Sequence, residues 1–165
     1  MKTLLIIRHA KSSWANLGEQ DFDRDLNERG KKDAPEMAQR LVDKQTAIDV
    51  FISSPARRAK KTCKAFCKIF GANDEKIIFA DKLYHADSET FYGLIESLDD
   101  SNKHAAIFSH NPGVTQFVNT LCESAKIDNM PTCAVFAVSI DIKAWKDFKK
   151  AEKIFLFFDY PKSVS

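Results

Sequence analysis

Arg8 and His9 stand together at the end of an apolar run, residues 4–7, near the start of the chain. A guanidinium binds anions through a planar fork of donors, and a neutral imidazole is a nucleophile near neutral pH. The same two residues would also be found where a buried strand simply ends at the solvent, without any chemical role. Whether the pair does chemistry depends on which other side chains are brought to that place.

Two further apolar runs end in similar residues, within the segments "FISSPARR" and "AAIFSHNPGV". The first segment supplies Arg57 and Arg58, and the second supplies His110. Pro55 and Pro112 favour helix starts directly afterwards, and the free N–H groups of a helix start attract anions. The same residue types therefore follow three separate apolar runs.

Short apolar runs bounded by polar residues are typical of buried strands. They cover residues 3–7, 50–52, 77–79, 105–108, 134–140 and 154–158. Between most of them the apolar residues have helical spacing, at 28–43, 55–70, 88–98 and 112–121. This alternation predicts an α/β fold, a three-layer α/β/α sandwich around a mostly parallel central sheet. Only the charged stretch 141–153 joins the last two strands, which leaves an antiparallel final pair open.

Ligands of such sheets bind outside the carboxyl ends of the strands. Arg8 and His9, Arg57 and Arg58, and His110 should therefore meet at one edge and form a pocket for an anion.

A histidine nucleophile held against an arginine-bound phosphoryl group fits these residues. Neighbouring arginines disfavour a second positive charge, so they push His9 toward the neutral form that attacks. The same arginines would neutralise charge on the phosphoryl oxygens in the transition state. A hydrogen bond from the other ring nitrogen to a backbone carbonyl would fix the tautomer.

The sequence contains neither a Gly-rich phosphate loop nor a dinucleotide-binding fingerprint, and it offers no cluster of carboxylates. We therefore predict a reaction without a nucleotide cofactor and without a metal.

Composition sets the broad class of protein. The 165 residues fit one domain, residues 1–165, and the net charge of +2 argues against a nucleic-acid partner. The first apolar run is too short for a secretion signal or a membrane span, so we expect a cytoplasmic protein with no membrane partner. The four cysteines are expected to be free and buried: Cys63, Cys67, Cys122 and Cys133.

The segments "IRHAKSSW", "DFDRDLNERGKKDAPEMAQRL", "FISSPARRAKKT" and "IFSHNPGV" resemble the histidine phosphatase (phosphoglycerate-mutase-like) superfamily. Among its members they are most similar to the small SixA-type phosphohistidine phosphatases. The resemblance extends over roughly residues 3 to 140. It implies a phosphoglycerate-mutase-like fold and a phosphatase that passes through a phosphohistidine without a cofactor.

The resemblance also implies a role for each matching residue. His9 corresponds to the phosphorylated nucleophile, and Arg8 and Arg57 correspond to the arginines that clamp the phosphate. Arg58 is expected to be structural or to face the solvent. His110 corresponds to the second histidine, which contacts the phosphoryl group.

Other positions match the family less closely. Arg24 corresponds to an arginine that reaches the substrate pocket in small members, and Trp14 and Asn16 fall where relatives place residues of the pocket rim. Ala10 replaces the commoner glycine of the first motif, and Asp25 replaces a proline.

The acid that protonates the leaving group is left open. Larger members carry a glutamate after the third strand, where this chain has "LYHADSETF". His85, Asp87 and Glu89 are all candidates, and the small phosphohistidine enzymes manage without this acid.

We expect the preferred substrate to be a phosphohistidine on a protein, such as a phosphotransfer domain or a carrier, with phosphate as the product. The stretches between strands leave little material for a cap over the site, and an open site admits a protein side chain. The alternatives are a small-molecule phosphomonoesterase and a phosphate-binding scaffold without catalysis.

Overall fold

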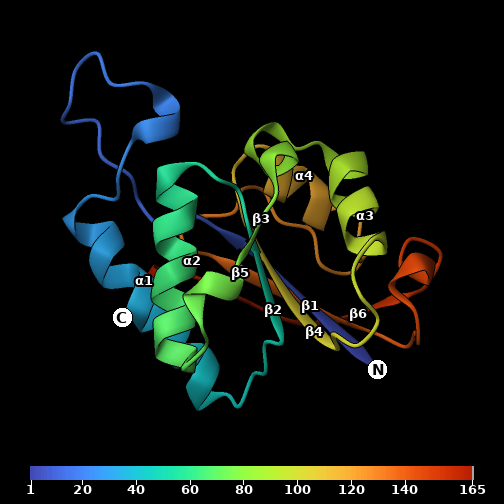
Figure 1. The fold of residues 1–165 in the computed structure, drawn as a ribbon. Coiled ribbons are helices and arrows are strands. Elements are labelled where there is room, and N and C mark those ends of the chain that lie inside the picture. Colours follow the sequence, from blue (N-terminus) through green and yellow to red (C-terminus); the bar gives the residue numbers. More distant parts are fainter. Residues whose placement is uncertain (165) are drawn as a thin grey trace.

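The computed structural model describes residues 1–164 and contains a six-stranded sheet between two layers of helices (Figure 1). The strands are β1 (Lys2–Arg8), β2 (Val50–Ser53), β3 (Ile78–Phe79), β4 (His104–Ser109), β5 (Val135–Ile140) and β6 (Lys153–Asp159). They lie side by side in the order β3-β2-β4-β1-β5-β6. The predicted α/β sandwich is confirmed.

Most neighbouring strands are parallel. β3, β2, β4 and β1 run in one direction, whereas β5 pairs antiparallel with β1 and β6 pairs antiparallel with β5. The antiparallel final pair, which the sequence left open, is therefore present. The sequence did not predict that β5 runs antiparallel to β1 as well.

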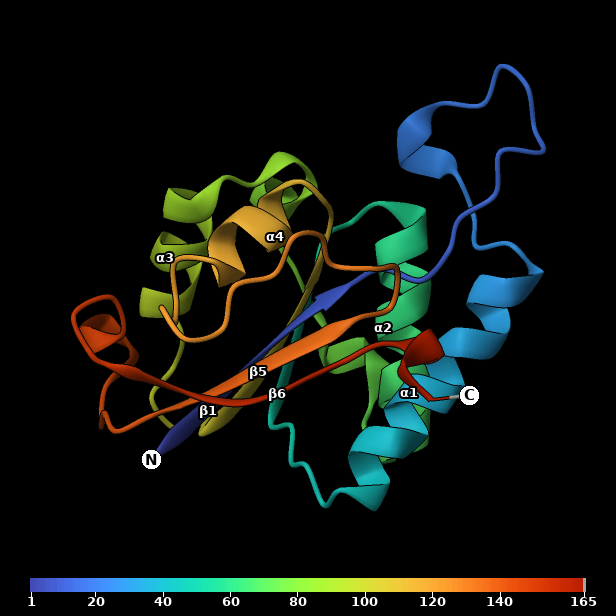
Figure 2. The ribbon, with the colours of Figure 1, turned by 180° about the vertical axis from the view of Figure 1, so that it is seen from behind.

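Two helices cover each face of the sheet (Figure 2). α1 (Glu28–Asp43) and α2 (Arg57–Phe70) lie on one face, and α3 (Ser88–Glu96) and α4 (Gly113–Val118) lie on the other. The bounds of α1 agree with the sequence pattern, but α4 ends three residues earlier than expected. Short 3-10 turns at Asp21–Asp23 and Asp81–His85 precede α1 and α3.

Residues of β1 alternate between the two cores. Leu4 and Ile6 pack into the core beneath α3 and α4, while Leu5 and Ile7 pack into the core beneath α1 and α2. Since both faces are covered, the strand is apolar at every central position rather than at every second one.

The pairing brings three strand ends to one edge of the sheet. Arg8 is in register with Ser109, and the backbone N–H of His9 donates to the Ser109 carbonyl at 3.1 Å. On the other side of β4, the N–H of Ser54 donates to the Phe108 carbonyl at 3.0 Å. The residues that follow β1, β2 and β4 are therefore neighbours.

A close backbone contact fixes the loop after β1 against the start of α1. A Cβ atom at Gly30 would lie 2.2 Å from the Lys11 carbonyl oxygen, so only glycine allows this approach. The side chain of Asn27 caps the helix by accepting from the Gly30 N–H at 2.9 Å.

The predicted state of the cysteines is confirmed, because all four are free and buried. In residues 1–164, no helix has both the length and the apolar character needed to cross a bilayer.

Candidate active site

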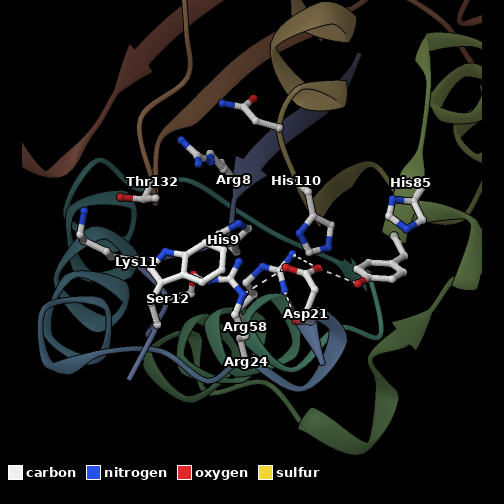
Figure 3. Close-up of a pocket in the computed structure, with 13 residues that line it drawn as sticks. Arg8, His9, Lys11, Ser12, Asp21, Arg24, Arg58, His85, His110 and Thr132 are labelled. Atoms are coloured by element: carbon white, nitrogen blue, oxygen red, sulfur yellow. Dashed lines mark hydrogen bonds and ion pairs between the residues drawn. The ribbon is translucent and has the colours of Figure 1, made fainter. Parts of the chain in front are cut away.

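A cavity of about 430 Å³ opens at the carboxyl edge of the sheet (Figure 3). Its walls come from the ends of β1 and β4, the start of α2, and the loops before α1 and α3. The lining residues are Arg8, His9, Lys11, Ser12, Trp14, Asp21, Arg24, Arg58, Tyr84, His85, His110, Asn111 and Thr132.

His9 is buried, and one of its ring nitrogens is committed to the backbone. Nδ1 lies 2.7 Å from the Ala10 carbonyl oxygen, and because a carbonyl only accepts, Nδ1 carries the proton. Nε2 is then the nitrogen with a free lone pair. This bond to a backbone carbonyl fixes the tautomer of His9, as expected from the sequence.

The pKa of His9 is lowered to about 3. Burial is the largest cause, and the positive charges of Arg58, Arg8 and Arg24 lower it further, against the bond to Ala10, which raises it. His9 is therefore neutral at physiological pH.

His110 lies beside His9, with the ring centroids 5.1 Å apart. Its Nε2 is 2.7 Å from the Ser54 hydroxyl, while its Nδ1 is buried without a hydrogen-bond partner. Burial, the neighbouring His9 and Arg58 lower the pKa of His110 to about 2. A second neutral imidazole with one unsatisfied nitrogen thus faces the first.

Three arginines line the cavity: Arg8, Arg24 and Arg58. Arg8 donates from Nη1 to the Met130 carbonyl at 2.9 Å, and its Nε is buried without a partner. Burial and the charge of Arg58 lower the pKa of Arg8. The site therefore concentrates positive charge in a place partly removed from water.

Asp21 holds two of these arginines. Its carboxylate accepts from Arg24 Nε at 3.1 Å and from Arg58 Nη2 at 3.0 Å, and its carbonyl accepts from Arg58 Nη1 at 2.7 Å (Figure 3). The Tyr84 hydroxyl donates to the same carboxylate at 2.6 Å. The bond from Tyr84 and those from the arginines keep the pKa of Asp21 well below its usual range. The cluster thus already holds one anionic group.

The structure corrects the choice between Arg57 and Arg58. The Arg57 side chain is 49% exposed, pairs with Asp25 at 3.2 Å and lies outside the cavity, whereas the Arg58 side chain is 7% exposed and lines it. Consecutive helix residues point about 100° apart, and here this difference in direction turns Arg58 into the cavity and Arg57 toward the surface. Arg58 precedes buried Ala59 and lies one turn before buried Thr62, a helical pattern that could have identified it.

The segment before α1 contributes Arg24 but not Asn16. Arg24 lines the cavity, and its guanidinium lies 3.6 Å from the centroid of the Trp14 ring, which also lines it. Asn16 is exposed and is absent from the lining, so its expected place at the pocket is wrong. It lies in a surface loop whose course no periodic pattern specifies.

Of the three candidates for the acid, only His85 lines the cavity. Asp87 caps α3 by accepting from the Thr90 N–H at 2.8 Å. Glu89 forms an ion pair with Lys149 at 3.1 Å, away from the cavity.

Sequence reasoning missed Asp21 and Tyr84. The only available signal for Asp21 was its position three residues before Arg24, and Tyr84 lies beside a candidate that was noticed, His85. Within residues 1–164, no three side chains of His, Cys, Asp or Glu come together in a way that could hold a metal ion.

The chain is similar to known proteins in sequence and in fold. Residues 4–126 match the family model of the histidine phosphatase superfamily (branch 1). Phosphoserine phosphatase 1 of Hydrogenobacter thermophilus is 34% identical over 97 residues, which are 58% of this chain and 44% of that protein. The chain spans about half the length of the curated relatives it matches.

Solved structures match nearly the full length of the chain. A structure from Agrobacterium tumefaciens, provisionally named as the phosphohistidine phosphatase SixA, is 28% identical and has a TM-score of 0.81. The match covers 97% of this chain and 98% of that one. A protein histidine phosphatase SixA complexed with tungstate has a TM-score of 0.83 at 19% identity, with 99% of both chains covered, and supports the fold.

The match of the family model spans most of the chain and includes both histidines, all three arginines of the cavity and Asp21. The chain belongs to the histidine phosphatase superfamily, branch 1.

Proposed function

We propose that this protein is a phosphatase that forms a transient phosphohistidine on His9 and acts on phosphohistidine carried by another protein. One observation carries the proposal: a buried, neutral His9, whose Nδ1 proton is held by the Ala10 carbonyl, lies in a cavity lined by three arginines. Phosphoryl transfer to a histidine requires a neutral imidazole as the nucleophile and cationic groups around the phosphoryl oxygens.

In the first step, Nε2 of His9 attacks the phosphorus. An N–P bond forms on His9, and the bond between phosphorus and the leaving nitrogen of the substrate breaks. Arg8, Arg24 and Arg58 stabilise the charge on the phosphoryl oxygens, and His110 lies close enough to His9 to contact the same group through Nδ1.

In the second step, water attacks the phosphorus, the N–P bond to His9 breaks, and inorganic phosphate leaves.

The leaving imidazole of the first step takes a proton from solvent or from His85, which lines the cavity and is exposed. An amine-type leaving group needs less help than an alkoxide, which suits a site whose other two candidate acids lie elsewhere.

The resemblance to the Agrobacterium structure, which extends over nearly the full length of both chains, supports a protein substrate. A small-molecule phosphomonoester is the second candidate, because a curated relative of higher identity is named a phosphoserine phosphatase. A cytoplasmic location is part of the proposal, since four free cysteines suit a reducing compartment.

The test is the rate of phosphate release from a phosphohistidine protein, compared with phosphoserine and a sugar phosphate, in wild type and His9→Ala. We expect the phosphohistidine protein to be the best substrate and His9→Ala to be inactive. His104→Ala is the matched control, because His104 begins β4 outside the cavity.

A phosphorylated enzyme should be trapped by alkaline quench, which preserves N–P bonds, and should be absent in His9→Ala. Undiminished turnover in His9→Ala would overturn the mechanism. Faster turnover of phosphoserine would favour the second candidate, and no turnover of any substrate with intact phosphate binding would indicate a scaffold.

A further inference from the structure

The outer side of α2 carries a row of cations that the proposed mechanism does not use. We call it the α2 basic face; its members, all exposed, are Arg57, Lys60, Lys61, Lys64 and Lys68. The helix contains no aspartate or glutamate. Since the whole chain has a net charge of only +2, this is a local concentration of charge.

The α2 basic face borders the catalytic cavity. A groove of about 350 Å³ is lined by Phe22, Asp23, Pro55, Arg57, Lys60, Lys61 and Lys64. The turn Asp21–Asp23 separates the two hollows: Asp21 lines the cavity, while the next two residues line the groove. A molecule with its phosphoryl group at His9 would therefore have its adjoining surface next to these lysines.

Helix stability does not explain the cations near the start of α2. Arg57 and Lys60 lie in its first turn, where the helix dipole disfavours positive charge, and no acidic residue occupies that turn. Arg58 in the same turn has a place in the cavity, but Arg57 and Lys60 do not.

Asp25 offsets part of this charge. Its carboxylate lies 3.2 Å from Arg57 and 3.7 Å from Lys61. Among the described residues, Lys60, Lys64 and Lys68 form no ion pair, so three cations of the face are available to an external partner.

We propose that the α2 basic face docks an acidic segment of the phosphorylated protein substrate. Arg57, Lys61, Lys64 and Lys68 follow the spacing of one helix face and span about 16 Å along the axis at 1.5 Å per residue. That row is longer than a small phosphate ester and matches a stretch of another protein. The inference rests on the proposed function, because it names the surface of the substrate around the phosphohistidine.

The test uses two short synthetic peptides with one phosphohistidine each, flanked by glutamates in one and by serines in the other. Wild type is compared with Lys60→Glu/Lys64→Glu. The matched control is Lys146→Glu/Lys150→Glu, which makes the same charge change at exposed lysines outside both hollows.

We expect wild type to prefer the acidic peptide, with most of the preference lost at high salt because exposed charges are screened. Lys60→Glu/Lys64→Glu should lower kcat/KM for the acidic peptide about tenfold or more, equivalent to about 1.4 kcal/mol. Free phosphohistidine should be hydrolysed within about twofold of wild type, which shows an intact cavity.

Asp25→Asn gives a prediction of opposite sign. It frees Arg57 and Lys61 but keeps the side-chain oxygen that accepts from the Leu26 N–H at 2.8 Å. We expect kcat/KM for the acidic peptide to rise and its dependence on salt to steepen.

Equal turnover of both peptides by wild type and by Lys60→Glu/Lys64→Glu would overturn the docking surface and leave the proposed function standing. An equal loss on free phosphohistidine would overturn it too, because the lysines would then belong to a small-molecule site. If no phosphohistidine substrate is turned over, the proposed function fails; binding of the unphosphorylated acidic peptide, followed by fluorescence anisotropy, then decides the docking surface alone.

Discussion

Arg57 and Arg58 are adjacent in the chain, yet their guanidinium groups reach different surroundings. One lies near Asp25 at the surface, and the other lies in the cavity with Asp21. The distinction depends on the direction of each side chain around α2.

Arg58→Ala should lower kcat/KM on free phosphohistidine by about 10²- to 10³-fold, as expected for loss of one group that stabilises transition-state charge. The loss should exceed that of Arg57→Ala by at least tenfold, measured in the same steady-state assay. Equal losses in the two variants would contradict the placement of Arg58.

The two neutral histidines make stability depend on pH. Their pKa values are about 3 for His9 and about 2 for His110, against 6.5 for an ordinary histidine. Between the lowered and the ordinary pKa values, the unfolded chain binds more protons than the folded one. The contribution of the two neutral histidines to the free energy of unfolding is therefore fully present above pH 6.5 and decreases as the pH falls below it.

His9→Gln/His110→Gln should therefore flatten the fall in the free energy of unfolding as the pH is lowered below 6.5. Wild type should lose roughly 1.4 kcal/mol more per pH unit for each histidine that gains a proton on unfolding. Urea denaturation at a series of pH values measures the difference, and parallel curves would show that the pKa values of both histidines are the same in the folded and unfolded chain.

At this scale the sequence predicts the residues that are joined directly to a strand end. Arg8 ends β1, and His9 and His110 directly follow β1 and β4, so strand pairing alone brings them together. Arg58 depends on a rotation of about 100° within a helix, and Asn16 depends on the course of a loop, which composition does not specify.

At the level of elements, the apolar runs predict where strands lie because a strand buried on both faces leaves a continuous apolar segment. The direction of β5 is harder to predict from the sequence. It is set by the irregular connection after α4, residues 119–134, which has too little periodicity to show whether the chain crosses over the sheet or turns back.

The contact between α1 and the loop after β1 fixes the position of that loop beside the cavity. Gly30→Ala would place a Cβ atom 2.2 Å from the Lys11 carbonyl, which forces the backbone apart. We expect a loss of about 1–3 kcal/mol in the free energy of unfolding, together with a lower kcat/KM, because Ser12 and Arg24 share a hydrogen bond beside this contact.

Gly93→Ala in α3 is the matched control, since nothing lies within 4 Å of a Cβ atom there. It should raise the free energy of unfolding by roughly 0.5–1 kcal/mol through the better helix propensity of alanine. If thermal and urea unfolding show the same change in both variants, the close contact at Gly30 has no energetic importance.

Over the whole molecule, α1 links the carboxyl edge of the sheet to the segment after β6. Arg40 near its C-terminus donates to the Tyr160 carbonyl at 3.0 Å and to the Pro161 carbonyl at 2.8 Å. It also forms an ion pair with Asp159 at 3.3 Å. These contacts attach the segment after β6 to the helix whose other end holds the loop at the cavity.

Arg40→Ala should lower the free energy of unfolding by about 1–3 kcal/mol, because the two carbonyls and the buried Asp159 lose a donor. Arg40→Lys should restore only part of it, since one ammonium cannot reproduce the fork. Gln39→Ala on the exposed side of α1 should stay within about 0.5 kcal/mol in the same urea denaturation series. Full recovery by lysine would show that charge alone matters.

The charge balance of the cavity also affects the end of the proposed reaction. Among the described residues that line it, Arg8, Lys11, Arg24 and Arg58 face a single carboxylate, Asp21. Inorganic phosphate is as anionic as the group that enters, so the cavity that attracts the substrate also retains the product. We expect product departure to limit turnover at saturating substrate, and we expect inorganic phosphate at cellular concentrations to inhibit the protein as a product.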